Sequence, residues 1–455
     1  MSVQRSYLKS RVINAGSWSV AGYAASFAIR LGSNLIMTRL LLPEMFGVMG
    51  IAYLVLSGLA LFSDLGLKPS VVQSKRGHEP DFLNTVWAVQ IVRGCVLWLA
   101  SIPVSVAIAA VARFDLVPKA SVYQQEELPY VVVAVAITAI FSGFESTKIL
   151  EAGRNLTLRR ITTIDLASQA CGLVVMVVWA AIDRSIWALV VGALAASMIR
   201  TVASHVALPG TSNRWLWERG ALDEILRFGK WIFLSSLLFF FASNGDRIVL
   251  GALVGARELG AYVIALVMVS AIDQLLTKVI VDVSFPALSE VIRLRPRDLG
   301  RTYYKFHAII APLTYAGSGF LFIAGQEIVN VLYDARYQQA GWILQVLAVA
   351  LLSIPFRMAT QAFLALGIER LYFVLHAIRI VSLFAGLWLG YHVAGFEGAV
   401  WGVVVSNFAN LPLTIIIAKQ RGMFELRKEV IALLAVLPGA AVGWGFTLLV
   451  SLFRH

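Results

Sequence analysis

Long apolar segments separated by short polar loops run along nearly the whole chain. A helix that crosses a bilayer needs about 20 mostly apolar residues, and thirteen segments meet that requirement. They lie near residues 13–38, 45–66, 83–112, 129–147, 161–182, 185–207, 229–251, 259–283, 306–326, 340–366, 371–391, 396–418 and 430–452. The pattern predicts an all-α polytopic membrane bundle of about 12–14 transmembrane helices.

Composition agrees with this prediction and excludes other classes of protein. Apolar residues make up 59% of the 455 residues, charged residues only 14%, and the mean hydropathy is +0.79. Soluble domains carry roughly 45–50% apolar and about 25% charged residues. The net charge of +12 would suit a nucleic-acid partner, but the cations form no single patch. Two cysteines, Cys95 and Cys171, both in apolar segments, do not make a disulfide framework.

The distribution of the cations predicts an orientation in the membrane. With Arg200 and Lys230 counted with the polar stretch at 209–228 that they flank, the N-terminal tail and every second loop hold 25 of the 38 lysines and arginines, whereas the alternate loops and the C-terminal tail hold 7. The positive-inside rule therefore places the N-terminus in the cytoplasm, and an odd number of spans places the C-terminus outside. The first apolar segment contains Arg30 and is too long for a cleavable signal, so we expect it to remain as a helix.

The longest polar stretch divides the chain into two predicted lobes. We expect an N-lobe of helices 1–6 at 1–208, a cytoplasmic connector at 209–228 and a C-lobe of helices 7–12 at 229–419. A cytoplasmic loop and an extra C-terminal helix follow at 420–455. A shift of 213 positions brings Trp18 onto Trp231 and Gly47 onto Gly260. Because each lobe has an even number of spans, this predicts a parallel repeat with a pseudo-two-fold axis along the membrane normal.

Six cations fall inside predicted spans, apart from Arg200 and Lys230, which are counted with the connector although they lie within the bounds of their spans. Each of the six costs about 2.5–3.5 kcal/mol at a helix centre. Each cation has a polar residue three or four positions away, which places the two on the same face of the predicted helix. One interpretation is internal salt bridges with Asp64, Asp165, Asp246, Asp273 and Asp282, of which Asp246 beside Arg247 is the strongest structural candidate. The other is a cationic, water-filled cavity between the lobes for an anionic substrate, because arginine binds phosphate through its fork of donors. The cations are Arg30, Arg93, Arg247, Lys278, Arg357 and Arg379, and the polar companions are Asn34, Gln90, Asn244, Gln274, Gln361 and His376.

Motifs for enzymatic chemistry are absent from the sequence. The histidines have no metal-ligand spacing, and the chain contains no HExxH, Walker loop or nucleophile elbow. We therefore expect no metal, no cofactor and no nucleotide-driven step, and we expect that the protein is not an enzyme.

Several segments, taken in chain order, resemble the oligosaccharide flippases of bacterial polysaccharide export. These flippases share a superfamily with the multidrug and toxin extruders and the lipid II flippase. The segments are Thr38–Gly47 (TRLLLPEMFG), Ser63–Leu67 (SDLGL), Phe228–Trp231 (FGKW), Asp246–Gly251 (DRIVLG), Leu259–Tyr262 (LGAY), Phe285–Ser289 (FPALS), Val331–Ala350 (VLYDARYQQAGWILQVLAVA) and Ala365–Gly367 (ALG).

The resemblance implies a two-lobed bundle in the bacterial inner membrane with a central cavity and alternating access. It implies a substrate in which an oligosaccharide repeat unit is linked through pyrophosphate to undecaprenol. On this basis we expect Arg30, Arg93 and Arg357 to bind the pyrophosphate, with Arg247, Arg379 and Lys278 as weaker candidates. Coupling to Na⁺ or H⁺ would use Asp165, Asp273 or Asp282. The odd span count departs from the family's usual twelve or fourteen.

Three other functions are compatible with the sequence. A cation-coupled multidrug exporter would have an acidic or apolar cavity. A membrane-embedded glycosyltransferase or polymerase would change the mass of its lipid-linked substrate. A scaffold for the export machinery would tolerate loss of every buried arginine. The expected partners are the lipid-linked oligosaccharide and membrane lipids, with the polysaccharide polymerase and export machinery as further candidates.

Overall fold

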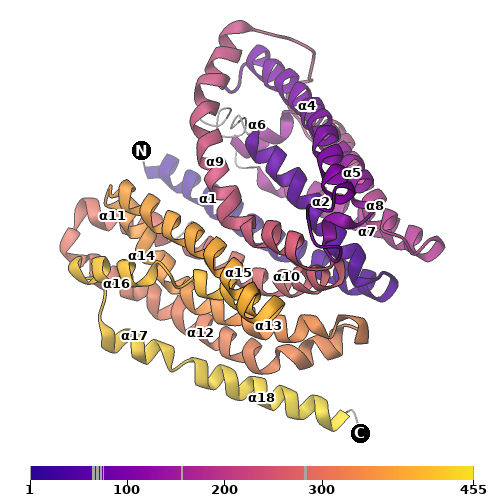
Figure 1. Cartoon of the computed structure of the whole chain (residues 1–455). Helices are drawn as coiled ribbons and strands as arrows, with labels where there is room; N and C mark the ends of the chain where they lie inside the picture. The colour runs from indigo at the N-terminus through magenta and orange to yellow at the C-terminus, as the bar shows by residue number, and fades with distance from the viewer. Residues whose placement is uncertain are drawn as a thin grey trace. The chain divides into compact units, whose positions relative to one another are not determined.

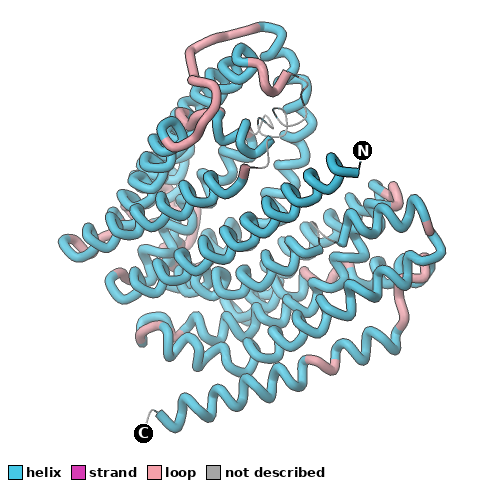
Figure 2. The backbone as a smooth tube through the Cα atoms, turned by 180° about the vertical axis from the view of Figure 1, so that it is seen from behind, coloured by secondary structure: helices cyan, strands magenta, loops and turns pink. Residues whose placement is uncertain are grey.

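The computed structural model in Figure 1 describes residues 2–63, 67, 71, 74, 76–154, 157–280 and 284–453. All regular structure in these ranges is helical, as the tube in Figure 2 shows. The predicted all-α membrane fold is thereby confirmed. The chain divides into two compact units, Met1–Phe241 (unit 1) and Ala242–His455 (unit 2), and the boundary lies inside one long helix, α9 (Arg219–Leu253).

Unit 1 is built from long helices joined by short connections. Helix α4 packs along α5, α7 packs along α8, and α1 packs on α7. Proline residues at the starts of α2 and α4 fit there because a first-turn N–H needs no partner within the helix. The helices are α1 (Ser2–Leu40), α2 (Pro43–Phe62), α4 (Pro80–Arg113), α5 (Leu128–Gly143), α6 (Lys148–Arg154), α7 (Leu158–Ile182) and α8 (Trp187–Val206).

The predicted connector is partly helical, because α9 begins at Arg219. Ala221 is fully buried against Phe82 and Val86 at the start of α4, and Leu222 packs on the same cluster. Glu218, just before the helix, accepts hydrogen bonds from Arg76 at 2.8 and 2.9 Å. The charged stretch therefore has one apolar face that holds it on unit 1. The predicted lobe boundaries at 208 and 419 stay predictions.

The described residues of unit 2 form the end of α9 and nine further α-helices. Helix α12 is central to its packing, since it contacts α13, α14 and the C-terminal helices α17 and α18. Figure 1 shows α18 running alongside α12. The helices are α10 (Ala256–Val279), α11 (Phe285–Leu294), α12 (Leu299–Leu332), α13 (Gln339–Ala350), α14 (Ile354–Ala365), α15 (Glu369–Ser406), α16 (Leu411–Gln420), α17 (Leu426–Leu433) and α18 (Val436–Phe453).

Every predicted span coincides with a helix or a pair of consecutive helices. The predicted separation of the spans at 371–391 and 396–418 corresponds to an interruption of α15 at Ala394 and Gly395, where Gly395 has a φ of 59°. Glycine adopts this left-handed conformation without the steric cost that a Cβ would add. Among the described residues, nine stretches are long and apolar enough to cross a membrane, and one of them, 370–420, covers both of these spans. The number of crossings and the two related lobes stay predictions.

Candidate functional site

An ion pair joins α14 to α10 within unit 2. The half-buried guanidinium of Arg357 places Nη1 2.7 Å from Oδ1 of Asp273, and the same nitrogen donates a hydrogen bond to the Thr277 hydroxyl at 3.1 Å. Asp273 and Thr277 lie four residues apart, on one face of α10. The predicted cation Arg357 and the predicted ion-coupling residue Asp273 are therefore direct partners.

A second guanidinium lies beside this pair. Arg379 on α15 is half-buried and lies within electrostatic range of Arg357, Asp273 and Asp246. In the described part of the chain, Arg379 has neither a hydrogen bond nor an ion pair. One helical turn earlier, the imidazole of His376 interacts with the Tyr372 carbonyl at 2.9 Å. Arg379 therefore lies near the ion pair of Arg357 and Asp273 but, among the described residues, forms no ion pair with a carboxylate.

Helix α9 supplies a third guanidinium through Arg247. Its Nη2 donates a hydrogen bond to the side chain of Asn244 at 2.6 Å, which is the pairing along one helix face that the sequence indicated. Its Nε is buried and has no hydrogen-bond partner among the described residues. The expected pairing of Arg247 with Asp246 is wrong, since Asp246 accepts a hydrogen bond from Tyr262 at 2.5 Å instead. Consecutive residues on a helix do not face each other.

We refer to Arg247, Arg357, Arg379, Asp246 and Asp273 together as the unit 2 charge cluster. Its three guanidinium groups exceed its two carboxylates by one, which favours an anion. Planar guanidinium groups can bind phosphate oxygens through two parallel hydrogen bonds. Two predicted neighbours, the exposed Gln274 and the half-buried Gln361, lie on the same helices as cluster residues. Three further predictions, for the Lys278 side chain, Asp282 and Asp64, lie outside the described residues.

Arg93, in unit 1, binds the end of a neighbouring helix. Its Nη2 donates a hydrogen bond to the Ala60 carbonyl at 2.7 Å, and its Nε donates one to the Ser63 hydroxyl at 3.0 Å. Both acceptors lie at the C-terminus of α2, where carbonyl groups lack partners within the helix and the helix dipole attracts a cation. These contacts hold Arg93 at the end of α2.

The other residues of unit 1 predicted to line the cavity are Gln90, Arg30 and Asn34, which lie on two different helices. The Gln90 amide donates hydrogen bonds to the carbonyls of Ser142 and Glu145 at 2.8 and 3.2 Å, and thereby caps the end of α5. Arg30 is exposed on α1, and Asn34 one turn later is half-buried. The structure therefore shows Arg93 bound at the end of α2 and Gln90 bound at the end of α5.

Asp165, a predicted ion-coupling residue, forms part of a charged triad that the sequence analysis missed. Arg200 on α8 places Nε 2.7 Å from Oδ1 of Asp165 on α7, and its Nη1 also pairs with Glu145. Glu145 is only 9% exposed. The sequence could have indicated that Glu145 needs a buried partner, because it is the only charged residue between Leu128 and Lys148. Asp273 pairs with one of the six cations, Arg357, as the salt-bridge interpretation has it. Asp165 pairs with Arg200 instead, which is not among those six.

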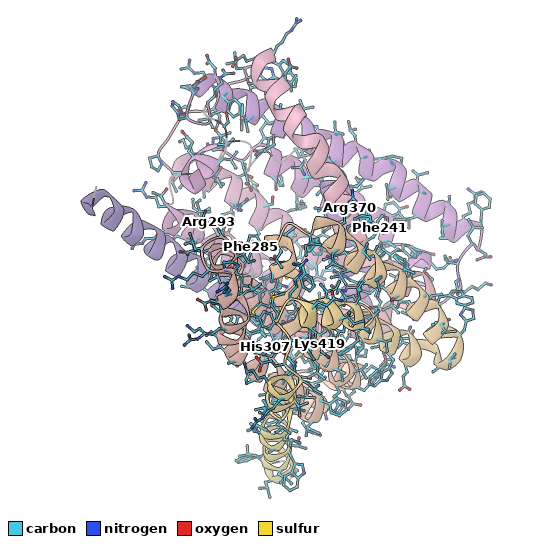
Figure 3. The ribbon with its side chains drawn as sticks, turned by 90° about the vertical axis from the view of Figure 1, so that its left-hand side faces the viewer. Phe241, Phe285, Arg293, His307, Arg370 and Lys419 are labelled. Atoms are coloured by element: carbon cyan, nitrogen blue, oxygen red, sulfur yellow. The ribbon has the colours of Figure 1, made fainter. Side chains whose placement is uncertain are left out.

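A second buried contact between polar side chains, also unpredicted, attaches α17 to α12. His307 Nε2 lies 3.0 Å from Oε2 of Glu429, and the Tyr304 hydroxyl donates a hydrogen bond to the other carboxylate oxygen at 3.1 Å. Figure 3 marks His307 on α12. The imidazole and the carboxylate are both buried. In the described ranges, no group of three or more His, Cys, Asp or Glu side chains could hold a metal ion.

Solved structures with the same fold define the class of protein. The lipid II flippase MurJ, in an inward closed conformation, superposes with a TM-score of 0.70 at 12% identity, over 92% of this chain and 91% of MurJ. An inward-facing multidrug resistance transporter of the MATE family superposes with a TM-score of 0.62 at 15% identity, over 86% and 93% of the two chains. The fold is therefore that of a multi-pass membrane transporter.

Residues 36–341 match the family described as polysaccharide biosynthesis protein. The chain belongs to this family, which confirms the predicted resemblance. The lipopolysaccharide biosynthesis protein WzxC of Escherichia coli (strain K12) is 21% identical over 75% of this chain and 67% of its own length. The succinoglycan biosynthesis transport protein ExoT of Rhizobium meliloti (strain 1021) is 22% identical over 73% and 65%. The matches thus span about two thirds of these relatives.

Proposed function

We propose that this protein is a flippase for lipid-linked oligosaccharides. It moves undecaprenyl-pyrophosphate-linked repeat units from the cytoplasmic to the outer leaflet for the synthesis of exopolysaccharide, capsule or O-antigen. The family match over 36–341 carries this proposal. It is supported by two relatives named for lipopolysaccharide biosynthesis and succinoglycan transport, and by a fold shared with a lipid II flippase. The protein acts as a transporter and not as an enzyme.

The pyrophosphate is the part of this substrate that cannot enter hydrocarbon unaided. We assign its binding to arginines, because guanidinium groups stay charged and match phosphate oxygens geometrically. The contacts within unit 2 favour Arg379 and Arg357. Arg379 has no carboxylate partner among the residues that the structure describes, and Arg357 could exchange its bond with Asp273 for one with phosphate. Arg247 offers a buried Nε as a further donor.

Arg30 and Arg93 contribute from unit 1 in this proposal. Arg93 would have to leave the Ala60 carbonyl to reach the substrate, just as Arg357 would have to leave Asp273. Alternating access of two lobes would carry the bound pyrophosphate across, with the sugars in water and the polyprenyl chain in the bilayer. Outward movement of each negative charge gains about 2.3 kcal/mol per 100 mV of inside-negative potential.

The proposed location is the bacterial inner membrane, with the N-terminus in the cytoplasm. The unequal division of lysines and arginines between alternate loops supports this orientation. The proposed partners are polysaccharide polymerase and export machinery, which would consume the repeat units on the outer side. Coupling to Na⁺ or H⁺ through Asp165, Asp273 or Asp282 is a further part of the proposal.

A reconstituted transport assay tests the proposed function. Purified protein in liposomes is given undecaprenyl pyrophosphate bearing a tagged sugar, and the assay follows both the exposure of the tag and the mass of the lipid. We expect the lipid to cross intact, and we expect the same rate for Arg184→Gln, which changes an exposed loop arginine. A changed lipid mass would indicate a glycosyltransferase. Transport of cationic drugs without movement of the lipid would indicate a multidrug exporter, the function of the solved structure with a TM-score of 0.62.

A further inference from the structure

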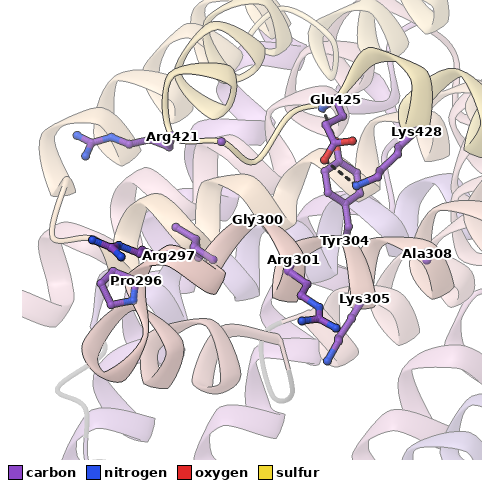
Figure 4. A pocket seen from close by; sticks show the side chains of 12 residues that line it. Pro296, Arg297, Gly300, Arg301, Tyr304, Lys305, Ala308, Arg421, Glu425 and Lys428 are labelled. Atoms are coloured by element: carbon purple, nitrogen blue, oxygen red, sulfur yellow. Dashed lines mark hydrogen bonds and ion pairs between the residues drawn. The ribbon is translucent and has the colours of Figure 1, made fainter.

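A basic pocket of about 780 Å³ lies in unit 2 at the beginning of α12. Its walls come from two segments distant in sequence: the turn before α12 with its first turns, at 296–308, and the turn between α16 and α17, at 421–428 (Figure 4). The charged residues that line it are Arg297, Arg301, Lys305, Arg421, Lys428 and Glu425. Five cations therefore surround one carboxylate.

Most of this positive charge is uncompensated. The carboxylate of Glu425 lies 2.6 Å from Nζ of Lys428, so these two charges neutralise each other. The remaining four cations are exposed and, among the described residues, have no ion-pair partner. Like charges gathered in one pocket repel each other, and an anion bound between them would relieve that repulsion.

The backbone holds the two basic segments together. Gly422, just after α16, has a φ of 69°, which turns the chain back toward α12. A Cβ added to Gly300 would lie 2.3 Å from the Gly422 carbonyl oxygen, so the close approach requires glycine there. The Tyr304 hydroxyl accepts a hydrogen bond from the backbone N–H of Glu425 at 2.6 Å. The pocket is therefore formed by fixed contacts within unit 2.

A second pocket of about 530 Å³ adjoins the first, between α11 and α12. Lys305 lines both pockets. Five of its nine lining residues are apolar, among which Leu294 and Ile309 are 61% and 68% exposed, and Glu290, Arg295 and Thr302 line it as well. A basic pocket next to an open apolar groove fits a ligand with an anionic head and a hydrocarbon chain.

We propose that the two pockets together bind one anionic glycerophospholipid, with its phosphate at Arg301 and Lys305 and an acyl chain in the groove between α11 and α12. The predicted span at 306–326 begins just after Lys305, and the predicted span at 396–418 ends just before Arg421, so in this proposal the basic residues lie beside the lipid headgroups. Basic pockets between membrane helices are suited to anionic headgroups. The site shares no lining residue with the unit 2 charge cluster, so it is separate from the proposed substrate site.

Lipid titration of the full chain tests this proposal without any transport substrate. Detergent-purified protein is titrated with phosphatidylglycerol or phosphatidylcholine, and native mass spectrometry measures the bound lipid. We expect preference for phosphatidylglycerol, and an affinity loss of about 30-fold in Arg301→Gln/Lys305→Gln. The matched control, Arg293→Gln/Arg427→Gln, removes two exposed cations of the adjoining helices that line neither pocket (Figure 3 marks Arg293). We expect it to lose no more than about threefold.

Three outcomes would overturn the proposal. The first is an equal loss of affinity in both double variants, which would mean that the lipid responds to the overall positive charge of the surface and not to this pocket. The second is binding of phosphatidylcholine as tight as that of phosphatidylglycerol. The third is tighter binding of undecaprenyl phosphate than of phosphatidylglycerol, with the same sensitivity to Arg301→Gln/Lys305→Gln, which would make this a site for the substrate lipid. Because every variant side chain is exposed, unchanged melting temperatures serve as the check on folding.

Discussion

Removal of the Arg200 side-chain charge should destabilise unit 1, because it leaves two carboxylates without their common partner. Arg200 pairs with both Glu145 and Asp165, and Glu145 is nearly inaccessible to solvent. Breaking a fully buried ion pair by removing one partner costs about 3–5 kcal/mol. The side chains of Arg200 and Asp165 are 33% and 34% exposed, and solvent screens such charges. We therefore expect Arg200→Met to lower the free energy of unfolding by about 2–3 kcal/mol.

The assay is thermal unfolding of the purified protein in detergent. For a unit of this size, a loss of that magnitude lowers the melting temperature by about 4–12 °C. The triple variant Arg200→Met/Glu145→Gln/Asp165→Asn removes the stranded charges, so we expect it to recover most of the loss. Asp165→Asn alone should cost less than Arg200→Met, because Arg200 keeps Glu145. An Arg200→Met protein as stable as the wild type, or a triple variant no better than the single one, would refute the reasoning.

Three further variants test contacts in both units through the same melting measurement. Glu429→Gln removes the charge between Tyr304 and His307, and we expect a loss of about 1–3 kcal/mol and faster proteolysis of α17; an unchanged cleavage rate would argue against the contact. Tyr262→Phe leaves buried Asp246 without its donor and should cost about 1–3 kcal/mol, whereas no loss would mean that another donor replaces it. Arg93→Gln should cost about 1–2 kcal/mol through its bonds at the end of α2; full stability with lost transport would instead favour substrate binding.

Structural features that are determined by residues close together in the sequence, such as the helices themselves, could be predicted. Membrane-spanning helices are specified by about 20 consecutive apolar residues, so all predicted spans coincide with helices. The contact between Asn244 and Arg247 follows from helical spacing. The interruption of α15 lies at Gly395, between two predicted spans.

Contacts between distant residues could not be predicted in this way. Glu145 and Arg200 are 55 residues apart, and Tyr304 and Glu429 are 125 residues apart. Hydropathy places each residue on a helix but does not determine which helices pack together. For the same reason, the sequence identified Arg93 as a buried cation without revealing the helix end that it binds.

The start of α9 illustrates a different difficulty. Arg219 and the charged residues after it are typical of a solvated connector, yet Ala221 and Leu222 supply an apolar face that packs on α4. The sequence repeats this apolar pair four residues later, at Ile225 and Leu226. That spacing is typical of an amphipathic helix, so the helical start of α9 could have been predicted, whereas the surface of α4 on which it packs could not.

The most direct test of the account is transport by Arg379→Gln in liposomes, using undecaprenyl pyrophosphate with a tagged sugar. Arg379 is half-buried in the unit 2 charge cluster and, in the described ranges, has no carboxylate partner, so its loss strands no charge. A hydrogen bond to a charged group is worth about 1.5–3 kcal/mol, so we expect transport to fall by about 10- to 100-fold. Arg379→Lys should retain part of the rate, and Arg184→Gln all of it. Wild-type transport by an equally abundant Arg379→Gln protein would contradict the account.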